Sequence, residues 1–271
     1  NAGRRVDHNT GIPLVLNAAV QKGHHPTKGN FQMKKLLLAT VLIAASGAAF
    51  AQDVVRLGTE GAYPPFNFIN DAGEIAGFER EVGDELCKRA ALTCEWVTNE
   101  WDSIIPNLQS GNYDVIIAGM SITDEREEVI DFSQNYYPPT SSVYVALAAD
   151  ADLTGVISAQ VSTIQAAYVA EAGATLLEFA TPDETVAAVR NGEAAAVFAD
   201  KEFLVPIVAE SGGELMFVGE DVRLGDGVGL GLRESDTELK AKLDAAIQSM
   251  KDDGSLNVLI EKHFGPEGAK F

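Results

Sequence analysis

The pattern of apolar and polar positions along the chain predicts an α/β protein. Amphipathic segments, with apolar residues three or four positions apart as on one face of a helix, alternate with short continuous apolar runs. Such runs are typical of strands in a parallel sheet that is covered on both faces. One strand is predicted at 114–118. A helix is predicted from residue 78, with an apolar face formed by Phe78, Val82, Leu86 and Ala90.

A faint internal repeat organises this pattern. Residues 104–119 and 184–200 each contain an amphipathic helix, a glycine at its C-terminal end and an apolar strand, and aligning the two copies superposes Gly119 on Asp200. Ligands of open α/β sheets bind beyond the carboxyl ends of the strands. Two lobes that face each other would therefore place these two residues across one cleft. The alternative for Asp200 is that it only caps the helix after it.

The connections between the copies predict crossings between two lobes. Residues 136–142 lack helical periodicity and lead into a predicted strand at 143–149. After Asp200 the pattern predicts a helix and a strand, and the glycine-rich run 225–231 that follows them is the expected return crossing. No Lys-Ser/Thr pair follows this run and no helix starts on it, which excludes a phosphate loop.

Capping signals predict where several helices begin. The segments 181–184 and 235–238 both have the pattern of a capping box, the first with proline at the first helical position. The second box opens a helix whose apolar residues are Leu239, Leu243, Ile247 and Met250. A last helix is predicted at 255–264, before Gly265 and Pro266.

The segment from Gly119 to Arg126 (GMSITDER) has the residue types of a carboxylate receptor. It places a serine hydroxyl, free backbone groups and a guanidinium just after the carboxyl end of the buried strand. Thr123 is the predicted N-cap of a helix with acidic residues in its first turn. Arg126 lies in that turn, and its planar fork suits a carboxylate held by two parallel hydrogen bonds. The alternative is an arginine on a solvated helix face, paired with Glu127 or Glu128.

The N-terminal part of the chain is predicted to lie outside the mature fold. Residues 33–51 combine a basic start, a short apolar core and an Ala-Phe-Ala site, as in a secretory signal peptide cleaved after Ala51. The apolar run is too short to favour a membrane span, which leaves an uncleaved anchor as the lesser alternative. Residues 1–32 precede Met33 and are interpreted as upstream translated sequence or an expression artefact rather than an ordered extension. We therefore expect a periplasmic product that begins at Gln52.

The charge of the chain argues against two classes of partner. Residues 1–51 contain six of the 20 Lys and Arg and one of the 40 Asp and Glu, which leaves 14 basic and 39 acidic residues and a net charge of −25 after them. Nucleic acid and anionic membranes are poor partners for such a chain. We interpret the acidity as a contribution to solubility, with attraction of cations as the alternative.

The two cysteines are predicted to form a disulfide. Cys87 falls late on the helix that begins at residue 78, and Cys94 opens the next strand. An even pair at this short separation in an exported protein is most simply a disulfide. Only one histidine, His263, follows the predicted signal peptide, which argues against a metal site and against catalysis by histidine.

Together these features resemble the periplasmic amino-acid-binding proteins of ABC importers, in particular the branch of the family 3 solute-binding proteins that binds lysine, arginine, ornithine and histidine. The resemblance covers residues 52–271 and rests on LGTEGAYPPFNF, GEIAGFEREVGDELCKR with the second cysteine of LTC, IIPNLQSGNYDVIIAGMSITDER, FSQNYY and GLGLRESDTELKAKL. It implies an α/β, two-lobed periplasmic-binding-protein fold of type II, with two crossing hinge strands and a ligand cleft. Lobe 1 is expected at 52–138 and 226–271, and lobe 2 at 139–225.

The resemblance also implies residues that bind the backbone of an amino acid. Arg126 corresponds to the clamp on the α-carboxylate, with Ser121 and Thr163 completing it. Thr163 precedes a predicted helix whose N-terminus favours an anion. Asp200 corresponds to the acceptor of the α-ammonium, assisted by the Gly119 carbonyl.

Other residues correspond to the end of the pocket that holds the ligand side chain. Glu60, Tyr63 and Trp101 would place an acid between two aromatic faces, which suits a cationic side chain through charge-assisted bonds and cation–π attraction. Glu79 corresponds to a further acid in the pocket of related proteins, with an exposed carboxylate at the helix start as the alternative.

Several residues depart from the family pattern. Glu60 stands in place of the aspartate usual in this branch, which leaves the preferred length of the ligand side chain open. Ala118, a further candidate for ligand contact, and Gly119 stand where serines are common. Ser162 stands where the loop before Thr163 more often has a glycine.

We therefore expect a monomer without a cofactor that captures a free amino acid, lysine, arginine or ornithine or also histidine, by hinge closure and delivers it to a membrane ABC permease complex. Two other classes stay open. One is a periplasmic dehydratase of the same fold that acts on a prephenate-like acid, with Glu60 or Glu79 as general acid or base. The other is the ligand-binding component of a sensory system. The intact clamp for an α-amino acid favours binding without turnover.

Overall fold

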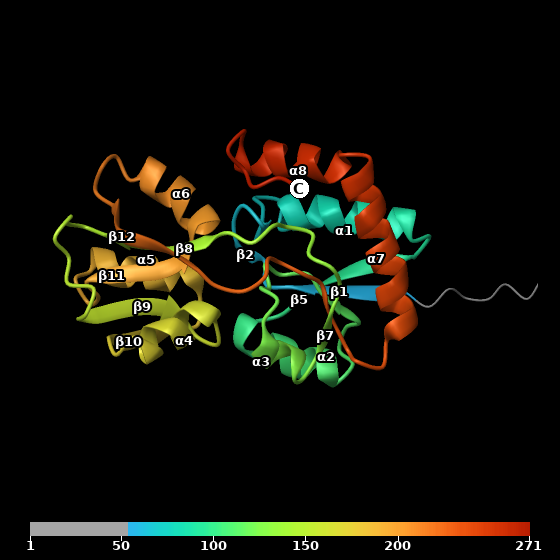
Figure 1. Cartoon of the computed structure of the whole chain (residues 1–271), viewed down its shortest axis with the longest axis horizontal. Coiled ribbons are helices and arrows are strands. Elements are labelled where there is room, and N and C mark those ends of the chain that lie inside the picture. Colours follow the sequence, from blue (N-terminus) through green and yellow to red (C-terminus); the bar gives the residue numbers. More distant parts are fainter. Residues whose placement is uncertain (1–53) are drawn as a thin grey trace, which may run out of the picture. The chain divides into compact units, whose positions relative to one another are not determined.

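Helices and strands alternate through most of the protein (Figure 1). The structure, a computed structural model, describes residues 54–271, and the predicted signal peptide and residues 1–32 lie outside this part. The helices are α1 (Phe78–Arg89), α2 (Ile104–Gln109), α3 (Asp124–Glu127), α4 (Ile164–Glu171), α5 (Pro182–Arg190), α6 (Lys201–Glu210), α7 (Thr237–Asp252) and α8 (Ser255–Phe264), with a 3-10 turn η1 (Trp101–Ser103). The strands are β1 (Val55–Thr59), β2 (Ala62–Tyr63), β3 (Asn67–Ile69), β4 (Ile75–Ala76), β5 (Cys94–Thr98), β6 (Val115–Ile116), β7 (Asp131–Phe132), β8 (Ser141–Ala146), β9 (Val156–Gln160), β10 (Thr175–Phe179), β11 (Ala196–Asp200), β12 (Met216–Arg223) and β13 (Gly231–Leu232).

Two five-stranded sheets hold most of these strands. The first has the order β5-β1-β6-β13-β7 and the second the order β10-β9-β11-β8-β12, while β2, β3 and β4 form a small third sheet. In the first sheet β1 is parallel to β5 and β6, and β13 is antiparallel to β6 and β7. In the second sheet β9 is parallel to β10 and β11, and β8 is antiparallel to β11 and β12. The chain passes from the first sheet to the second between β7 and β8 and returns between β12 and β13. The predicted lobe boundaries near residues 138 and 225 stay predictions.

Apolar side chains cover both faces of the first sheet. On one face α1, α7 and α8 share a core with β1 through residues such as Val82, Ile247 and Ile260. On the other face α2 packs Ile104 and Leu108 against β6. Figure 1 shows the first group of helices on one side of β1 and β5, and α2 with α3 on the other side. Cover on both faces is what the continuous apolar strands predicted.

The second sheet is covered in the same way. Helices α5 and α6 contribute Val186 and Phe203 to a core with β8. On the opposite face Val169 of α4 packs with Phe198 of β11. Each sheet is therefore the centre of a three-layer unit.

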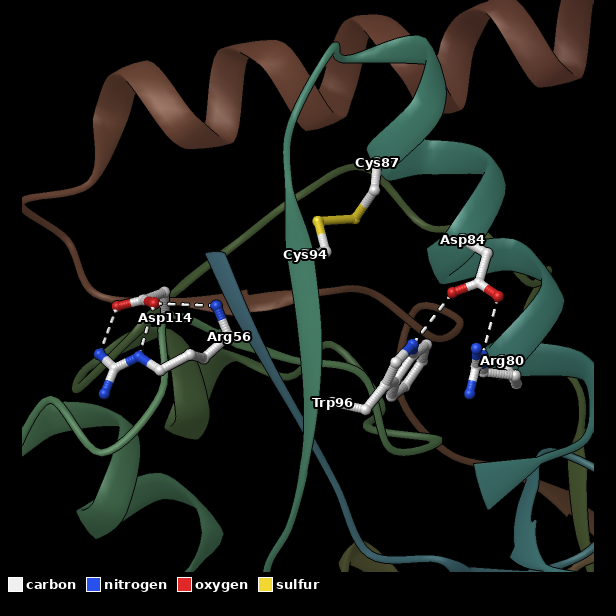
Figure 2. The surroundings of a disulfide bond; sticks show 7 residues. All are labelled: Arg56, Arg80, Asp84, Cys87, Cys94, Trp96 and Asp114. Carbon is white, nitrogen blue, oxygen red and sulfur yellow. Dashed lines mark hydrogen bonds and ion pairs between the residues drawn. A yellow bond between two sulfur atoms is a disulfide. The ribbon is translucent and has the colours of Figure 1, made fainter. Parts of the chain in front are cut away.

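The disulfide predicted between Cys87 and Cys94 is present, and it joins the end of α1 to the start of β5 (Figure 2). The same helix and strand are held together by a hydrogen bond from Trp96 Nε1 to Asp84 Oδ1 at 3.0 Å. They pack closely, because an added Cβ at Gly83 would lie 2.7 Å from the Trp96 ring. The glycine is required here by this close approach.

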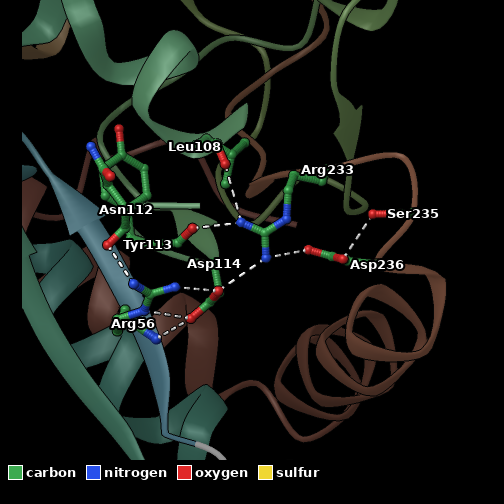
Figure 3. Close-up of polar contacts among 8 residues, drawn as sticks. All are labelled: Arg56, Leu108, Asn112, Tyr113, Asp114, Arg233, Ser235 and Asp236. Carbon is green, nitrogen blue, oxygen red and sulfur yellow. Dashed lines mark hydrogen bonds and ion pairs between the residues drawn. The ribbon is translucent and has the colours of Figure 1, made fainter. Parts of the chain in front are cut away.

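An ionic network fixes the segment that enters β6 (Figure 3). The Asp114 carboxylate accepts hydrogen bonds from Arg56 Nε at 3.0 Å and from Arg233 Nη2 at 3.0 Å. Arg233 Nη1 also donates to the carbonyls of Leu108 and Tyr113. The network joins β1, the end of α2 and the chain after β13, so that the start of β6 is held from three directions.

The capping box predicted at 235–238 is wrong. Helix α7 begins at Thr237, and its N-cap is Asp236, whose side chain makes no capping bond. The Asp236 carboxylate instead lies 2.7 Å from Arg233 Nη2, as an ion pair that is not aligned as a hydrogen bond. The nearby cation has therefore displaced the local capping interaction. The box at 181–184 is present, and Glu184 Oε2 accepts from the backbone N–H of Thr181 at 3.1 Å.

Candidate ligand-binding site

One cavity lies where strands of both five-stranded sheets end. The residues that line it are Glu60, Tyr63, Trp101, Ala118, Gly119, Ser121, Arg126, Gln160, Thr163, Ile164, Gln165 and Asp200. Glu60 directly follows β1, Ala118 follows β6 closely, and Gln160 and Asp200 end β9 and β11. The cavity therefore occupies the place where ligands bind in open α/β sheets, beyond the carboxyl ends of the strands.

The structure brings together nearly all of the residues that the sequence singled out. Eight expected ligand-binding residues and Ala118 line the cavity, whereas Glu79 does not. Three lining residues, Gln160, Ile164 and Gln165, were not predicted. Their places in the sequence could have indicated them, because Gln160 ends a strand and Ile164 and Gln165 begin the helix after Thr163.

Arg126 lies on the cavity as a guanidinium without a carboxylate partner among residues 54–271. The Thr123 side chain caps α3 by accepting from the Arg126 backbone N–H, as predicted. The Arg126 guanidinium donates to the Ser121 carbonyl at 2.8 Å and lies 5.4 Å from the centre of the Trp101 ring. Burial lowers its pKa to about 10. The alternative of a solvated arginine paired with its acidic neighbours is wrong.

The loop before α4 brings backbone groups to the same end of the cavity. Thr163 is the N-cap of α4, and its side chain accepts from the Ala166 N–H at 3.1 Å. Ser162 adopts a left-handed conformation with φ of 60° in the place where a glycine is more usual. Its carbonyl accepts from Trp101 Nε1 at 3.3 Å and from Arg126 Nη2 at 3.4 Å. The serine therefore takes the glycine-like geometry, and its carbonyl is held by side chains from η1 and α3.

Asp200 places a partly buried carboxylate on the cavity. Its two oxygens accept from the Tyr63 hydroxyl at 2.7 Å and from Gln165 Nε2 at 2.9 Å. It stands at the N-cap of α6 but makes no side-chain capping bond, so that capping alone does not explain it. Burial raises its pKa, against the opposing effects of the Tyr63 hydroxyl and the Arg126 charge.

Glu60 places a second carboxylate on the cavity. It accepts from Gln160 Nε2 at 2.6 Å. Burial is the main cause that raises its pKa to about 7, and the charges of Glu100 and Glu79 add to the rise. The neighbouring Tyr63 ring stacks on Phe203 with centroids 4.6 Å apart. An acid in such surroundings gains most from a cation placed beside it.

Both expectations for Glu79 need correction. The residue is fully buried, so that the exposed carboxylate expected as the alternative is wrong. It also does not line the cavity, because its carboxylate points to donors in the protein. The backbone N–H of Gly119 is one of these donors, at 2.6 Å.

Other kinds of site are not found in the part of the chain that the structure covers. Between residues 54 and 271, no group of three or more His, Cys, Asp or Glu side chains is arranged to hold a metal ion. The same part contains no helix that is both long and apolar enough to cross a membrane.

The chain is similar to a family of known proteins. The family described as bacterial extracellular solute-binding proteins, family 3, matches residues 55–266. The lysine/arginine/ornithine-binding periplasmic protein of Escherichia coli K12 is 32% identical over 256 residues, which cover 86% of this chain and 97% of that protein. The L-arginine-binding protein of Pseudomonas aeruginosa is 32% identical over 251 residues, with the same two shares. A crystal structure of a periplasmic His/Glu/Gln/Arg/opine family-binding protein from Silicibacter pomeroyi, in complex with lysine, is 75% identical with a TM-score of 0.80 and covers 80% of this chain and 100% of that chain.

The two α/β units and the cavity at their strand ends define a binding protein with the two-lobed, type II periplasmic-binding-protein fold. The chain belongs to family 3 of the bacterial extracellular solute-binding proteins.

Proposed function

We propose that this protein captures a free amino acid with a cationic side chain, by closure of lobe 1 (52–138 and 226–271) on lobe 2 (139–225), and delivers it to a membrane ABC permease complex. One observation carries the proposal: a single cavity holds a guanidinium without a carboxylate partner in the described chain and two partly buried carboxylates, Glu60 and Asp200. A basic amino acid has one carboxylate and two cationic groups, which is the complementary set.

The α-carboxylate of the ligand is assigned to Arg126, Ser121 and Thr163. The Arg126 fork offers two parallel hydrogen bonds, and the Ser121 hydroxyl lies on the same cavity. The N-terminus of α4, which Thr163 caps, adds backbone N–H groups and the positive end of a helix dipole.

The α-ammonium is assigned to Asp200 and the Gly119 carbonyl. The hydroxyl of Tyr63 and the amide of Gln165 hold the two carboxylate oxygens of Asp200, and each oxygen retains capacity for a further hydrogen bond. Because these two bonds already orient it, this carboxylate loses little conformational entropy when the ligand binds.

The ligand side chain is assigned to the end of the cavity formed by Glu60, Tyr63, Trp101 and Ala118. A cation there gains a charge-assisted bond to Glu60, whereas a neutral side chain leaves this carboxylate buried and poorly satisfied. The names of the matching relatives, which include lysine- and arginine-binding proteins, support the cationic assignment. So does the lysine named for the Silicibacter pomeroyi structure.

The proposal further includes binding without turnover by a monomer in the periplasm, after cleavage following Ala51. The relatives are named as binding proteins, and several as periplasmic, which supports this reading over a dehydratase. A prephenate turnover assay distinguishes the two classes, because only the enzyme consumes its ligand.

A thermal-shift screen tests the proposal. The protein is unfolded in guanidinium, dialysed and refolded to remove bound solute, and then screened against the twenty amino acids and ornithine. Ligand at roughly a hundred times its dissociation constant should stabilise the native state by about 2.7 kcal/mol. We expect lysine, arginine or ornithine to give the largest shift. A largest shift with glutamate or an apolar amino acid would contradict the cationic assignment, and no shift with any amino acid would contradict the whole proposal.

A further inference from the structure

We propose that Glu79 is a positioning residue: its buried carboxylate holds the backbone at Gly119 and, through Asn67, at Gly61 beside Glu60, and it ties both to Tyr136 on the chain that leaves the first sheet. This inference rests on the proposed function, because Gly119 and Glu60 serve two different ends of the proposed ligand site.

The start of α1 directs Glu79 into the protein interior. Gly77 has a φ of 110°, and an added Cβ there would lie 2.5 Å from the Phe66 carbonyl oxygen. The backbone N–H of Glu79 donates to that same carbonyl at 2.8 Å. The first turn of α1 is therefore pressed against the loop before it, and the side chain of its second residue is fully buried.

Three donors from distant parts of the sequence converge on the Glu79 carboxylate. Oε1 accepts from the Gly119 N–H at 2.6 Å and from the Tyr136 hydroxyl, and Oε2 accepts from Asn67 Nδ2 at 2.6 Å. The Asn67 side-chain oxygen in turn accepts from the Gly61 N–H at 2.7 Å. One carboxylate thereby orders the backbone at Gly119, which lines the cavity, and at Gly61, which follows the lining residue Glu60.

The two backbone positions that Glu79 controls are glycines in the left-handed region. Gly119 has a φ of 62° and Gly61 a φ of 74°. Such residues have wide conformational freedom, so a hydrogen bond to another part of the protein helps to hold them in one conformation. Gly61 directly follows Glu60, and the orientation of its peptide therefore helps to set where the Glu60 side chain begins.

Tyr136 connects the same carboxylate to the segments that join the two sheets. The Tyr136 N–H donates to the Val228 carbonyl at 2.8 Å, and Tyr137 pairs with Val228 as an isolated β-bridge. The outgoing chain and the returning chain therefore meet at this point. Glu79 is bonded to the outgoing chain, so the cavity backbone and the crossing are ordered by one group.

The arrangement requires an acceptor at both oxygens, which an amide does not provide. In a Glu79→Gln variant the side-chain NH₂ faces either Gly119 or Asn67. In the first case the Gly119 N–H loses its acceptor. In the second case Asn67 must turn its oxygen towards residue 79, and the Gly61 N–H loses its acceptor. Either outcome frees one backbone group of the proposed site.

A double variant restores the hydrogen-bond pattern and moves the negative charge from residue 79 to residue 67. In Asn67→Asp/Glu79→Gln, the glutamine oxygen accepts from Gly119 and Tyr136, and its NH₂ donates to the new aspartate. The other oxygen of that aspartate accepts from Gly61. Every hydrogen bond has a donor and an acceptor again, and the net charge equals that of the wild type.

Calorimetric titration of refolded, ligand-free protein with L-lysine tests the inference. We expect Glu79→Gln to weaken binding at least tenfold, or about 1.4 kcal/mol, and the double variant to return within threefold of the wild type. The matched control is Glu81→Gln on the same helix, which removes a carboxylate bonded to Lys262 and His263 rather than to the cavity. Its affinity should be unchanged.

Thermal unfolding of the ligand-free variants separates positioning from general packing. A folded Glu79→Gln protein that binds lysine within threefold of the wild type would overturn the inference. A double variant that regains its melting temperature but not its affinity for lysine would also overturn it.

If Glu79→Gln does not fold, Asn67→Ala gives the test, because it leaves Glu79 bonded to Gly119 and removes only the link to Gly61. An affinity loss below threefold would then count against the inference. A wild type that binds no amino acid would instead overturn the proposed function, and this inference with it.

Discussion

The two copies of the internal repeat, residues 104–119 and 184–200, reach the cavity with the same plan but offer it different chemistry. In the first copy α2 is followed by the short strand β6 and the chain bends away at Gly119, which has a positive φ. In the second copy α5 is followed by β11, which continues to Asp200. The first copy therefore ends in backbone groups and the second in a carboxylate.

This difference places a cation beyond the end of one copy and a carboxylate at the end of the other. The first side gains its cation from Arg126, one short loop beyond Gly119, while the second side has Asp200. The supports also differ, because Glu79 holds Gly119 from within one sheet unit, whereas Tyr63 reaches Asp200 from the other unit. A repeated framework can thus hold a zwitterion when each copy ends in a group of a different kind.

The largest effect is expected from removing either charge of this pair. Arg126→Ala should weaken lysine binding by about 3 to 5 kcal/mol, since it leaves the ligand carboxylate unpaired in a dehydrated cavity, and Asp200→Ala should act similarly on the ammonium. Calorimetry with lysine analogues separates the two sides. Arg126→Ala should no longer distinguish lysine from cadaverine, which lacks the carboxylate. Asp200→Ala should no longer distinguish lysine from 6-aminohexanoic acid, which lacks the α-ammonium.

A matched control for net charge is Arg223→Ala, which removes an exposed arginine that does not line the cavity. This control should bind lysine like the wild type. The assignment of the two sides fails if Arg126→Ala still prefers lysine over cadaverine by the wild-type margin, or if its affinity for lysine falls by less than about tenfold.

An intermediate effect is expected at the side-chain end of the cavity. Glu60→Gln should remove about 1.5 to 3 kcal/mol of the preference for lysine over glutamine, the range for a hydrogen bond to a charged group. The pKa of Glu60 is about 7 in the folded protein, so a proton competes with the cation below that pH. Wild-type affinity for lysine should therefore fall as the pH is lowered from 8 to 6, and Glu60→Gln should remove this dependence.

The same pKa has the opposite consequence for the ligand-free protein. Because burial raises the pKa of Glu60 from 4.5 to about 7, the folded state binds the proton more tightly than the unfolded state. The contribution of Glu60 to the free energy of unfolding is therefore fully present below pH 4.5 and is lost as the pH rises through 7. Glu60→Gln should thus raise the melting temperature of ligand-free protein at pH 8 more than at pH 5. An equal change at both pH values would contradict the burial of this carboxylate.

The smallest expected effect concerns two helix starts with the same sequence signal. Thr181→Ala should destabilise the protein by about 1 kcal/mol, because the capping box of α5 is formed. Ser235→Ala should cost close to nothing, since Asp236 and not Ser235 occupies the N-cap of α7. Urea unfolding of both variants checks the difference, and equal losses would contradict it.

Features set by neighbouring residues were predictable from the sequence. Helix α8 spans the predicted residues 255–264, Thr123 and Thr163 cap the helices that follow them, and Cys87 pairs with Cys94. Each of these depends on residues within a few positions of one another. Most residues that line the cavity were also predicted, but from the family resemblance and from the rule that ligands bind at strand ends, not from a local pattern.

Features set by distant residues were not predictable in the same way. The cap of α7 was predicted wrongly because Arg233 draws Asp236 away from a local interaction. The burial of Glu79 was missed because its donors, Gly119 and Tyr136, lie far along the chain. A carboxylate in the first turn of an amphipathic helix has the same sequence pattern whether solvent or buried donors surround it.

The placement of the two tryptophans gives the protein a built-in optical readout. Trp101 bonds to the Ser162 carbonyl, which precedes α4 on the second sheet unit, and it lies against Arg126. Trp96, the other tryptophan of the chain, is bonded to Asp84 of α1 beside the disulfide. Emission from Trp101 therefore senses the approach of one unit to the other, while Trp96 keeps its surroundings until α1 and β5 separate. Stopped-flow fluorescence of unlabelled protein can follow closure as an event distinct from unfolding.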